Sequence, residues 1–180
     1  MKNPQIALLL FGVVVLMGLT TVDTGAAASS TGTFGSQWQS LVGEWNGESP
    51  SGGSSGACGF HLDLSGHIIT RTNHAELAAA PGRPAGVHDD LMIIYPGPTE
   101  DKAKAIYFDN EGHVIEYSVE WSADGNLLTF LTKPGAGPQF RLTYKKTGPE
   151  KFLVAFEMAA PGQPGSFKPY TSGTIKRTGK

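Results

Sequence analysis

The sequence contains five histidines, whose side chains can take part in catalysis or bind metal ions. One of them begins the stretch His88-Asp89-Asp90, in which two carboxylates follow an imidazole. A histidine beside acids is the composition of an acid–base pair or of a metal ligand set. No histidine pair has the spacing of a helical zinc motif, and no Cys-x-x-Cys is present. We therefore predict no metal site and no cofactor. His88 and Asp90, with Tyr95, stay as candidates for a barrel-fold hydrolase or isomerase; the alternative is simple polarity where a loop enters a strand.

Other nucleophilic arrangements are missing from the sequence. No Gly-x-Ser-x-Gly stretch marks a nucleophilic serine, and the glycine–serine run at 52–56 lacks the spacing of a phosphate-binding loop. Cys58 is the single cysteine, so it cannot form an internal disulfide, and we interpret it as a small buried residue rather than a reactive thiol. These observations favour a binding protein over an enzyme.

The elements that would position these residues are β-strands. Apolar and polar residues alternate in ten stretches, separated by turns that carry glycine, often with proline or aspartate. The candidate strands cover residues 42–49, 57–64, 67–76, 89–95, 104–109, 113–121, 127–132, 138–145, 151–158 and 170–177. Short connections favour an antiparallel meander, and closure removes its exposed edges. We predict an all-β, closed antiparallel up-and-down barrel of about ten strands, with a short helical turn at residues 36–42.

The turn at Ser65-Gly66 determines which side chains of its hairpin share a face. A two-residue turn puts Arg71 and Asn73 on the apolar inner face. The same parity leaves His61 and His74 on the outer face, near each other across a strand pair. We interpret these two histidines as solvated surface residues rather than as a weak metal site.

Two later turns decide the inner face of the remaining strands. The turn near residues 110–112 is expected to have two or four residues, which puts Ile106 and Phe108 inside and Tyr107 outside. Tyr144 aligns with the inner residues of the strand after it only if the loop between them has an odd number of residues, or if a β-bulge intervenes.

Arg71 is the residue that most directly indicates a ligand. An inward guanidinium is costly in an apolar barrel unless a carboxylate or phosphate pairs with it. The partner is either the head group of a bound ligand or an internal carboxylate, for which Asp90 is the candidate. The other candidate ligand-binding side chains are polar tips in an otherwise apolar interior: Asn73, Tyr95, His113, Tyr117 and Tyr144.

Residues 1–28 have the organisation of a secretory signal peptide. Lys2 precedes an apolar run at 6–19, and the small residues 26–28 follow a short polar stretch. The apolar run is short for a membrane span, which needs about 20 residues. We expect cleavage before Ser29; the alternative is an uncleaved anchor.

The chain after the cleavage site is expected to form one domain. Residues 29–35 are polar and are predicted to be flexible, and residues 36–180 form the barrel. The formal net charge is −2 and no run of basic residues occurs, which argues against a nucleic-acid partner. We predict a periplasmic or secreted protein without membrane association after cleavage. The sequence carries no indication of oligomeric state.

The stretch Gly43-x-Trp45-x-Gly47, preceded by a helical turn, resembles the start of the calycin barrels, which include lipocalins and fatty-acid-binding proteins. In lipocalins this tryptophan closes one barrel end, and a basic side chain of the last strand packs across it. The resemblance implies a structural contact between Trp45 and Arg177, or its neighbour Lys176. The stretches "RTNHAE", "HDDLMIIY" and "YFDNEGHVIEY" are also similar to bacterial exported lipocalin-like proteins of unassigned function, which implies a fold but little chemistry.

Haem-binding nitrobindin barrels share the Gly-x-Trp-x-Gly step with this sequence. They ligate iron through a histidine near the C-terminal end of the chain. His113 is the last histidine here, so haem is not expected.

Three functions follow as hypotheses. The first is an exported barrel that binds a small, largely apolar or amphipathic ligand in its interior, with an anionic head group as one option, in a cavity of roughly a few hundred Å³. The second is the His/Asp/Tyr enzyme. The third is a structural or interaction domain without a ligand, which an interior packed with phenylalanines would favour.

Overall fold

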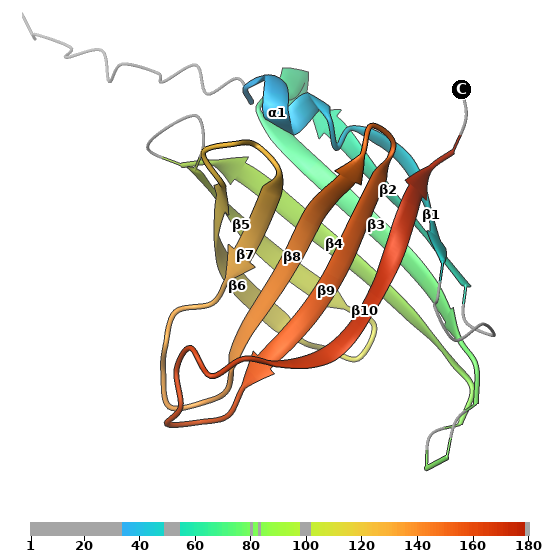
Figure 1. Cartoon of the computed structure of the whole chain (residues 1–180), viewed down its shortest axis with the longest axis vertical. Coiled ribbons are helices and arrows are strands. Elements are labelled where there is room, and N and C mark those ends of the chain that lie inside the picture. Colours follow the sequence, from blue (N-terminus) through green and yellow to red (C-terminus); the bar gives the residue numbers. More distant parts are fainter. Residues whose placement is uncertain (1–33, 49–54, 80, 83, 98–101, 179–180) are drawn as a thin grey trace, which may run out of the picture. The chain divides into compact units, whose positions relative to one another are not determined.

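The computed structural model describes residues 34–48, 55–79, 81–82, 84–97 and 102–178. In this part of the chain, ten antiparallel strands close into a barrel, each beside its neighbour in sequence, and the last strand pairs with the first (Figure 1). The elements are α1 (Ser36–Gln39), β1 (Gly43–Glu48), β2 (Ser55–Asp63), the 3₁₀ turn η1 (Leu64–Gly66), β3 (Ile68–Leu77), β4 (Gly86–Pro96), β5 (Lys102–Asp109), β6 (Val114–Trp121), β7 (Leu127–Leu131), β8 (Gln139–Gly148), β9 (Lys151–Ala159) and β10 (Lys168–Arg177).

The predicted fold class is confirmed, including the up-and-down order and the single helical turn. The predicted signal peptide, and residues 29–33 of the predicted flexible segment, lie outside the described residues. Within the described part of the chain, no helix is long and apolar enough to span a membrane.

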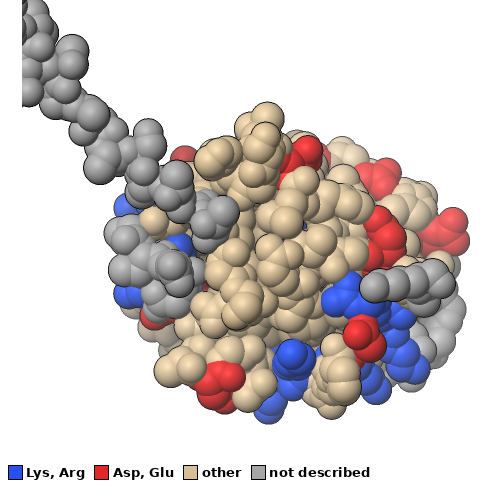
Figure 2. Space-filling view, turned by 90° about the horizontal axis from the view of Figure 1, so that it is seen from above, with Lys and Arg blue, Asp and Glu red and all other residues tan. Residues whose placement is uncertain are grey.

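One end of the barrel is covered by α1, and aromatic rings fill the space beneath it. Trp38 is fully buried, and its ring lies edge-on against Phe34 at 5.0 Å and against Trp121 at 5.8 Å between centroids. Viewed from this side, uncharged side chains cover the middle of the surface and charged ones lie mostly around it (Figure 2). We call this end the α1 end and the opposite one the distal end.

Trp45 and Arg177 join the first and last strands at the α1 end. The two residues are register partners, and Cζ of Arg177 lies 4.2 Å from the centre of the indole ring. The guanidinium also donates hydrogen bonds to the carbonyl oxygens of Val42, at 2.6 Å, and Ser40, at 2.7 Å. Gly43 has a φ of +131°, and a Cβ there would collide with Nη1 of Arg177, so this position requires glycine.

The hairpin of β2 and β3 has the predicted parity. Phe60 pairs with Arg71 and Cys58 pairs with Asn73, although η1 makes the connection longer than a two-residue turn. Of the two conditions under which Tyr144 aligns with the inner face of β9, the bulge is the one observed, because the register of β8 and β9 shifts between Lys146 and Gly148. As a result, Tyr144 lies on the inner face, opposite Val154.

The predicted parity of the hairpin of β5 and β6 is wrong. The pairing of Tyr107 with Ile115 and of Phe108 with Val114 leaves a turn with an odd number of residues. An odd turn reverses the face that each β5 residue occupies. Tyr107 and Asp109 therefore face inward, whereas Phe108 lies outside with 39% of its surface exposed.

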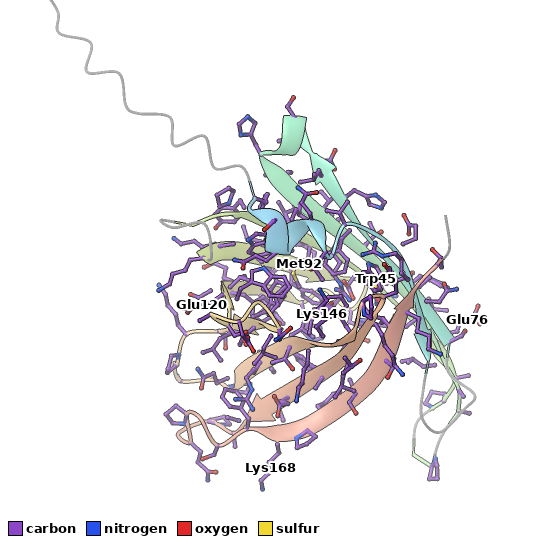
Figure 3. The ribbon with its side chains drawn as sticks, turned by 45° about the horizontal axis from the view of Figure 1, so that its top comes forward. Trp45, Glu76, Met92, Glu120, Lys146 and Lys168 are labelled. Carbon is purple, nitrogen blue, oxygen red and sulfur yellow. The ribbon has the colours of Figure 1, made fainter. Side chains whose placement is uncertain are left out.

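The barrel interior is packed differently at its two ends. Near α1 the inward side chains are almost fully buried and form a continuous aromatic and aliphatic core. Trp45 and Met92 belong to this core and lie within the ring of strands, whereas Glu76 and Lys168 lie outside it (Figure 3). Toward the distal end, several inward side chains are only partly buried: Tyr107, Ile115, Phe140, Val154 and Phe156.

Candidate functional site

Polar side chains gather on the inner face of three neighbouring strands at the distal end. β3 runs away from α1, β4 returns toward it, and β5 runs away again. The register places Asn73 opposite Asp90, and Asp90 opposite Asp109, in one row across these strands. We call this surface the polar wall; its members are Arg71, Asn73, His88, Asp90, Tyr107 and Asp109.

Arg71 forms an internal ion pair rather than presenting a free guanidinium. Its Nη1 lies 2.5 Å from Oδ1 of Asp90, and the side chains are 9% and 4% exposed. Asn73 donates to the second carboxylate oxygen at 3.0 Å. Burial raises the pKa of Asp90, and the nearby guanidinium opposes that effect. Burial also acts to lower the pKa of Arg71, but Tyr144 and Asp90 outweigh it, so the pKa is raised and Arg71 is charged.

His88 connects the ion pair to the next part of the polar wall. Its Nε2 lies 3.0 Å from the hydroxyl oxygen of Tyr107 and 3.5 Å from Oδ2 of Asp90. Tyr107 in turn donates to Oδ2 of Asp109 at 3.2 Å. Burial, followed by Asp90 and Asp109, raises the pKa of Tyr107, so its hydroxyl stays protonated. Because Tyr107 donates to Asp109, its oxygen is free to accept a hydrogen bond from Nε2 of His88.

The turn after β5 brings Glu111 and His113 to the rim of the barrel, where both contact Asp109. Oδ1 of Asp109 accepts hydrogen bonds from the backbone N–H groups of Glu111, at 3.0 Å, and His113, at 2.9 Å. Oδ2 lies 2.9 Å from Nδ1 of His113. Burial opposes ionisation of Asp109, but the hydrogen bonds from His113 and Tyr107 outweigh it and lower the pKa of this carboxyl group. Asp109 is therefore a fixed, ionised carboxylate.

An apolar surface faces the polar wall across the barrel. β4 and β9 lie half-way round the ring from each other, so their inner faces oppose (Figure 1). Phe140 and Phe156 stack with 5.7 Å between ring centres, and Phe156 also contacts Tyr170 edge-on at 5.8 Å. We call Phe140, Val154 and Phe156 the apolar wall; all three are partly buried.

Two buried polar atoms between the walls and the core have no hydrogen-bond partner among the described residues. They are Nε of Arg71 and the hydroxyl oxygen of Tyr144. Burial raises the pKa of Tyr144, with Arg71 opposing, so this hydroxyl is a neutral donor. Tyr117, another predicted ligand-binding residue, is also buried on the inner face, where its ring contacts Phe130 edge-on. A buried donor without a partner lowers the stability of the fold, so an acceptor that reached Nε of Arg71 or the hydroxyl of Tyr144 would form a favourable hydrogen bond.

Some predicted site residues lie elsewhere. Tyr95 belongs to the outer face of β4, because Met92 and Ile94 occupy the inner face and side chains alternate. Its assignment to the interior was wrong, since the apolar run before it hides the alternation. His61 and His74 are exposed as predicted, but each contacts its own carboxylate and they are not neighbours.

Three residues that the sequence reasoning missed complete the site: Tyr107, Asp109 and Glu111. The assumed even turn put Tyr107 on the outer face, Asp109 was given only as the end of a strand, and Glu111 was treated as a turn residue. The structure brings one ligand atom from each of His88, Asp109 and Glu111 within 4.8 Å of one another, a spacing that a metal ion can bridge. His113 contacts Asp109 but stands at the exposed edge.

Two hollows of the structure lie outside the packed core. One, of about 140 Å³, lies by the connection of β9 to β10 and is lined by Met158, Lys168 and Tyr170, among others. The other, of about 590 Å³, is an open depression over β5, β6 and β7. Neither is lined by Arg71. The predicted interior cavity is thus not one of these two spaces.

Comparisons with known proteins identify the fold. No protein-family model and no curated protein matches the chain. The crystal structure of Rv2717c from M. tuberculosis is similar, with a TM-score of 0.57, 14% identity, and 81% of this chain and 99% of that chain covered. The S-type phycobiliprotein lyase CPES from Guillardia theta aligns with a TM-score of 0.47 and 10% identity, covering 79% of this chain and 91% of that one. The chain has a calycin-like, ten-stranded antiparallel barrel fold.

Proposed function

We propose that the protein binds a small, largely apolar ligand at the distal end of the barrel, between the polar and apolar walls. The observation that carries this proposal is the contrast in packing. Inward side chains are almost fully buried near α1, but they are partly exposed toward the distal end. Covering the exposed part of the apolar wall would stabilise a complex by about 25 cal/mol for each Å² removed from water.

The charges at the polar wall favour a ligand with a neutral polar group over one with an anionic group. Arg71 is already paired with Asp90, so its charge needs no anionic head group. Asp109 and Glu111 add negative charge at the same rim and repel an anion. The unpaired donors on Arg71 and Tyr144 fit a carbonyl or hydroxyl oxygen once local packing opens. This argument favours an uncharged amphipathic molecule over the anionic option.

A matched pair of phenylalanines tests this proposal. Phe156 belongs to the apolar wall, whereas Phe108 is exposed on the outside of the barrel. The neutral dye N-phenyl-1-naphthylamine is titrated into the protein while its fluorescence is followed. We expect saturable binding that F156A weakens at least tenfold and F108A leaves unchanged. Near-ultraviolet circular dichroism checks that both variants keep the native packing. Equal affinity in all three proteins, or no saturable binding, would overturn the proposal.

The proposal includes export, as the first 28 residues suggest. Intact-mass analysis of the protein purified from its host tests this part. A mature chain that begins at Ser29 supports it, and a chain that keeps residues 1–28 contradicts it. Native mass spectrometry of the same sample would reveal any co-purifying ligand by its added mass.

An enzyme is the second candidate function, and one observation favours it. His88, Asp90 and Tyr107 share the inner face, and the Asp90 carboxylate and the Tyr107 hydroxyl both lie within 3.5 Å of Nε2 of His88. This group can take part in proton transfer, although Tyr95 is not a member of it. Hydrolysis of p-nitrophenyl acetate, faster than the uncatalysed reaction and lost in H88Q, would support an enzyme; equal rates with H88Q would not.

A further inference from the structure

We propose that His88, Asp109 and Glu111 bind a divalent transition-metal cation at the distal rim of the barrel. One ligand atom from each residue lies within 4.8 Å of the others, and Nδ1 of His88 is 3.4 Å from Oε1 of Glu111. A tetrahedral site with metal–ligand bonds of about 2.0–2.2 Å separates its ligand atoms by about 3.3–3.6 Å. The three groups therefore need only small side-chain movements to surround one ion.

The backbone holds this arrangement in place. β4 and β5 pair Asp90 with Asp109, so continuing the same register puts Glu111 opposite His88. The hydrogen bond from the N–H of Asn110 to the carbonyl of Asp89 shows that the pairing extends into the turn. Two backbone N–H groups hold Oδ1 of Asp109, and Oδ2 lies between the Tyr107 hydroxyl and Nδ1 of His113, so the carboxylate is fixed in place. Fixed ligands of this kind reduce the entropy that binding an ion costs.

The contacts on the two sides of the imidazole ring provide a second argument. Tyr107 donates a hydrogen bond to Asp109, and its oxygen lies 3.0 Å from Nε2 of His88. Nδ1, on the other side of the ring, faces a carboxylate oxygen of Glu111 at 3.4 Å. Metal-binding histidines commonly donate their other N–H to a nearby oxygen, and Nε2 of His88 is placed to do so here.

The charge balance at the rim points the same way. Among the described residues, Asp109 and Glu111 form ion pairs only with histidines, and neither pairs with a lysine or an arginine. The guanidinium of Arg71 is bound to Asp90. Two carboxylates thus share the rim without a permanent positive charge. A divalent cation would supply it.

The ligand set indicates the class of metal. One imidazole nitrogen with two carboxylate oxygens suits Zn²⁺, Co²⁺ or Mn²⁺, whereas Ca²⁺ and Mg²⁺ prefer sites made of oxygens alone. Three protein ligands leave at least one coordination position for water or for a polar group of a bound molecule. His113 stays outside this set and positions Asp109 through its contact with Oδ2.

Isothermal titration of chelator-treated protein with Zn²⁺ alone tests the site, and the visible absorption of bound Co²⁺ reports its geometry. We expect one ion per chain, with affinity at least tenfold weaker in H88Q and in E111Q. H74Q and E76Q are matched controls, because these residues form a second histidine–carboxylate contact on the outer face. Both controls should bind Zn²⁺ like the unmodified protein.

Several outcomes would overturn the site. These are the absence of saturable binding, a loss in only one of H88Q and E111Q, or an equal loss in H74Q or E76Q. Circular dichroism shows that a weakened variant is still folded, and both altered side chains are partly exposed at the rim. The metal titration contains no naphthylamine dye. A failure here therefore leaves the ligand proposal intact, and dye binding without a response to F156A leaves the metal site intact.

Discussion

Nη1 of Arg71 lies 2.5 Å from Oδ1 of Asp90 inside the barrel, and both side chains are almost inaccessible to water. Removing one member of a buried ion pair leaves an uncompensated charge and typically costs about 3–5 kcal/mol. We expect R71M and D90L each to lower the unfolding free energy by that amount, and the double variant R71M/D90L to lose much less than the sum. Urea denaturation of the four proteins measures the coupling. Additive losses would show that the pair is not coupled.

Arg177 is expected to be required as arginine rather than as any cation. A lysine cannot cover the indole of Trp45 and donate to the carbonyls of Ser40 and Val42 at the same time. R177K should therefore lose about 1.5–3 kcal/mol of stability, the range for hydrogen bonds to charged groups. The control is R141K, whose bidentate contact with Glu157 is more exposed and should contribute at most about 1 kcal/mol. Equal losses in the two variants would contradict this expectation.

The stability that Asp109 provides is expected to depend on pH. Its pKa in the folded protein is lowered, so the ionised form is favoured by folding. This stabilisation is present above the unfolded pKa, about 3.9, and is lost as the pH falls through the folded pKa. The difference in unfolding free energy between the unmodified protein and D109N should shrink from pH 6 to pH 3. A difference that stays constant over this range would contradict it.

Removing the hydroxyl of Tyr107 and removing that of Tyr144 should have opposite effects on the unfolding free energy. The hydroxyl of Tyr107 contacts His88 and Asp109, so Y107F is expected to cost about 1 kcal/mol. The hydroxyl of Tyr144 is buried and unpartnered, so Y144F should be neutral or stabilising by up to about 1 kcal/mol. Denaturant unfolding of the two variants measures both effects. A loss in Y144F as large as in Y107F would mean that this hydroxyl has a partner in solution.

Cys58 is expected to react slowly with thiol reagents. It is buried, and burial raises the pKa of its thiol, so little of the reactive thiolate is present at neutral pH. Ellman's reagent should modify it at the rate of local opening in native protein and rapidly in urea. Rapid modification of the native protein would show that this part of the barrel is open to solvent.

The sequence predicts the barrel well because alternation within a strand is a local property. The glycine-rich turns separate the strands, and the apolar face of each strand can be recognised from its own residues. The inward position of Arg71 follows from such parity and is what the structure shows. The inner face of a strand cannot be recognised from the sequence where both faces are apolar, as in the run before Tyr95. This is why Tyr95 was assigned to the wrong face of β4.

The candidate site was harder to predict because it depends on the length of one turn. An even turn after β5 would put Phe108 inside, whereas the observed odd turn puts Tyr107 and Asp109 there. A local signal for the odd turn exists in the sequence. Aspartate at the start of a turn often accepts a hydrogen bond from the N–H two residues later, as Asp109 does from Glu111.

The pairing of β1 with β10 also determines when the protein can fold. The hydrogen bonds of Arg177 to Ser40 and Val42 join residues from opposite ends of the barrel sequence, and the N–H of Thr178 donates to the carbonyl of Glu44. Until β10 has been synthesised and has paired, β1 and β9 each present an unpaired edge that can pair with another chain. Such distant contacts also slow folding itself, typically to milliseconds or longer in all-β domains. A chain without β10 would thus be prone to aggregate.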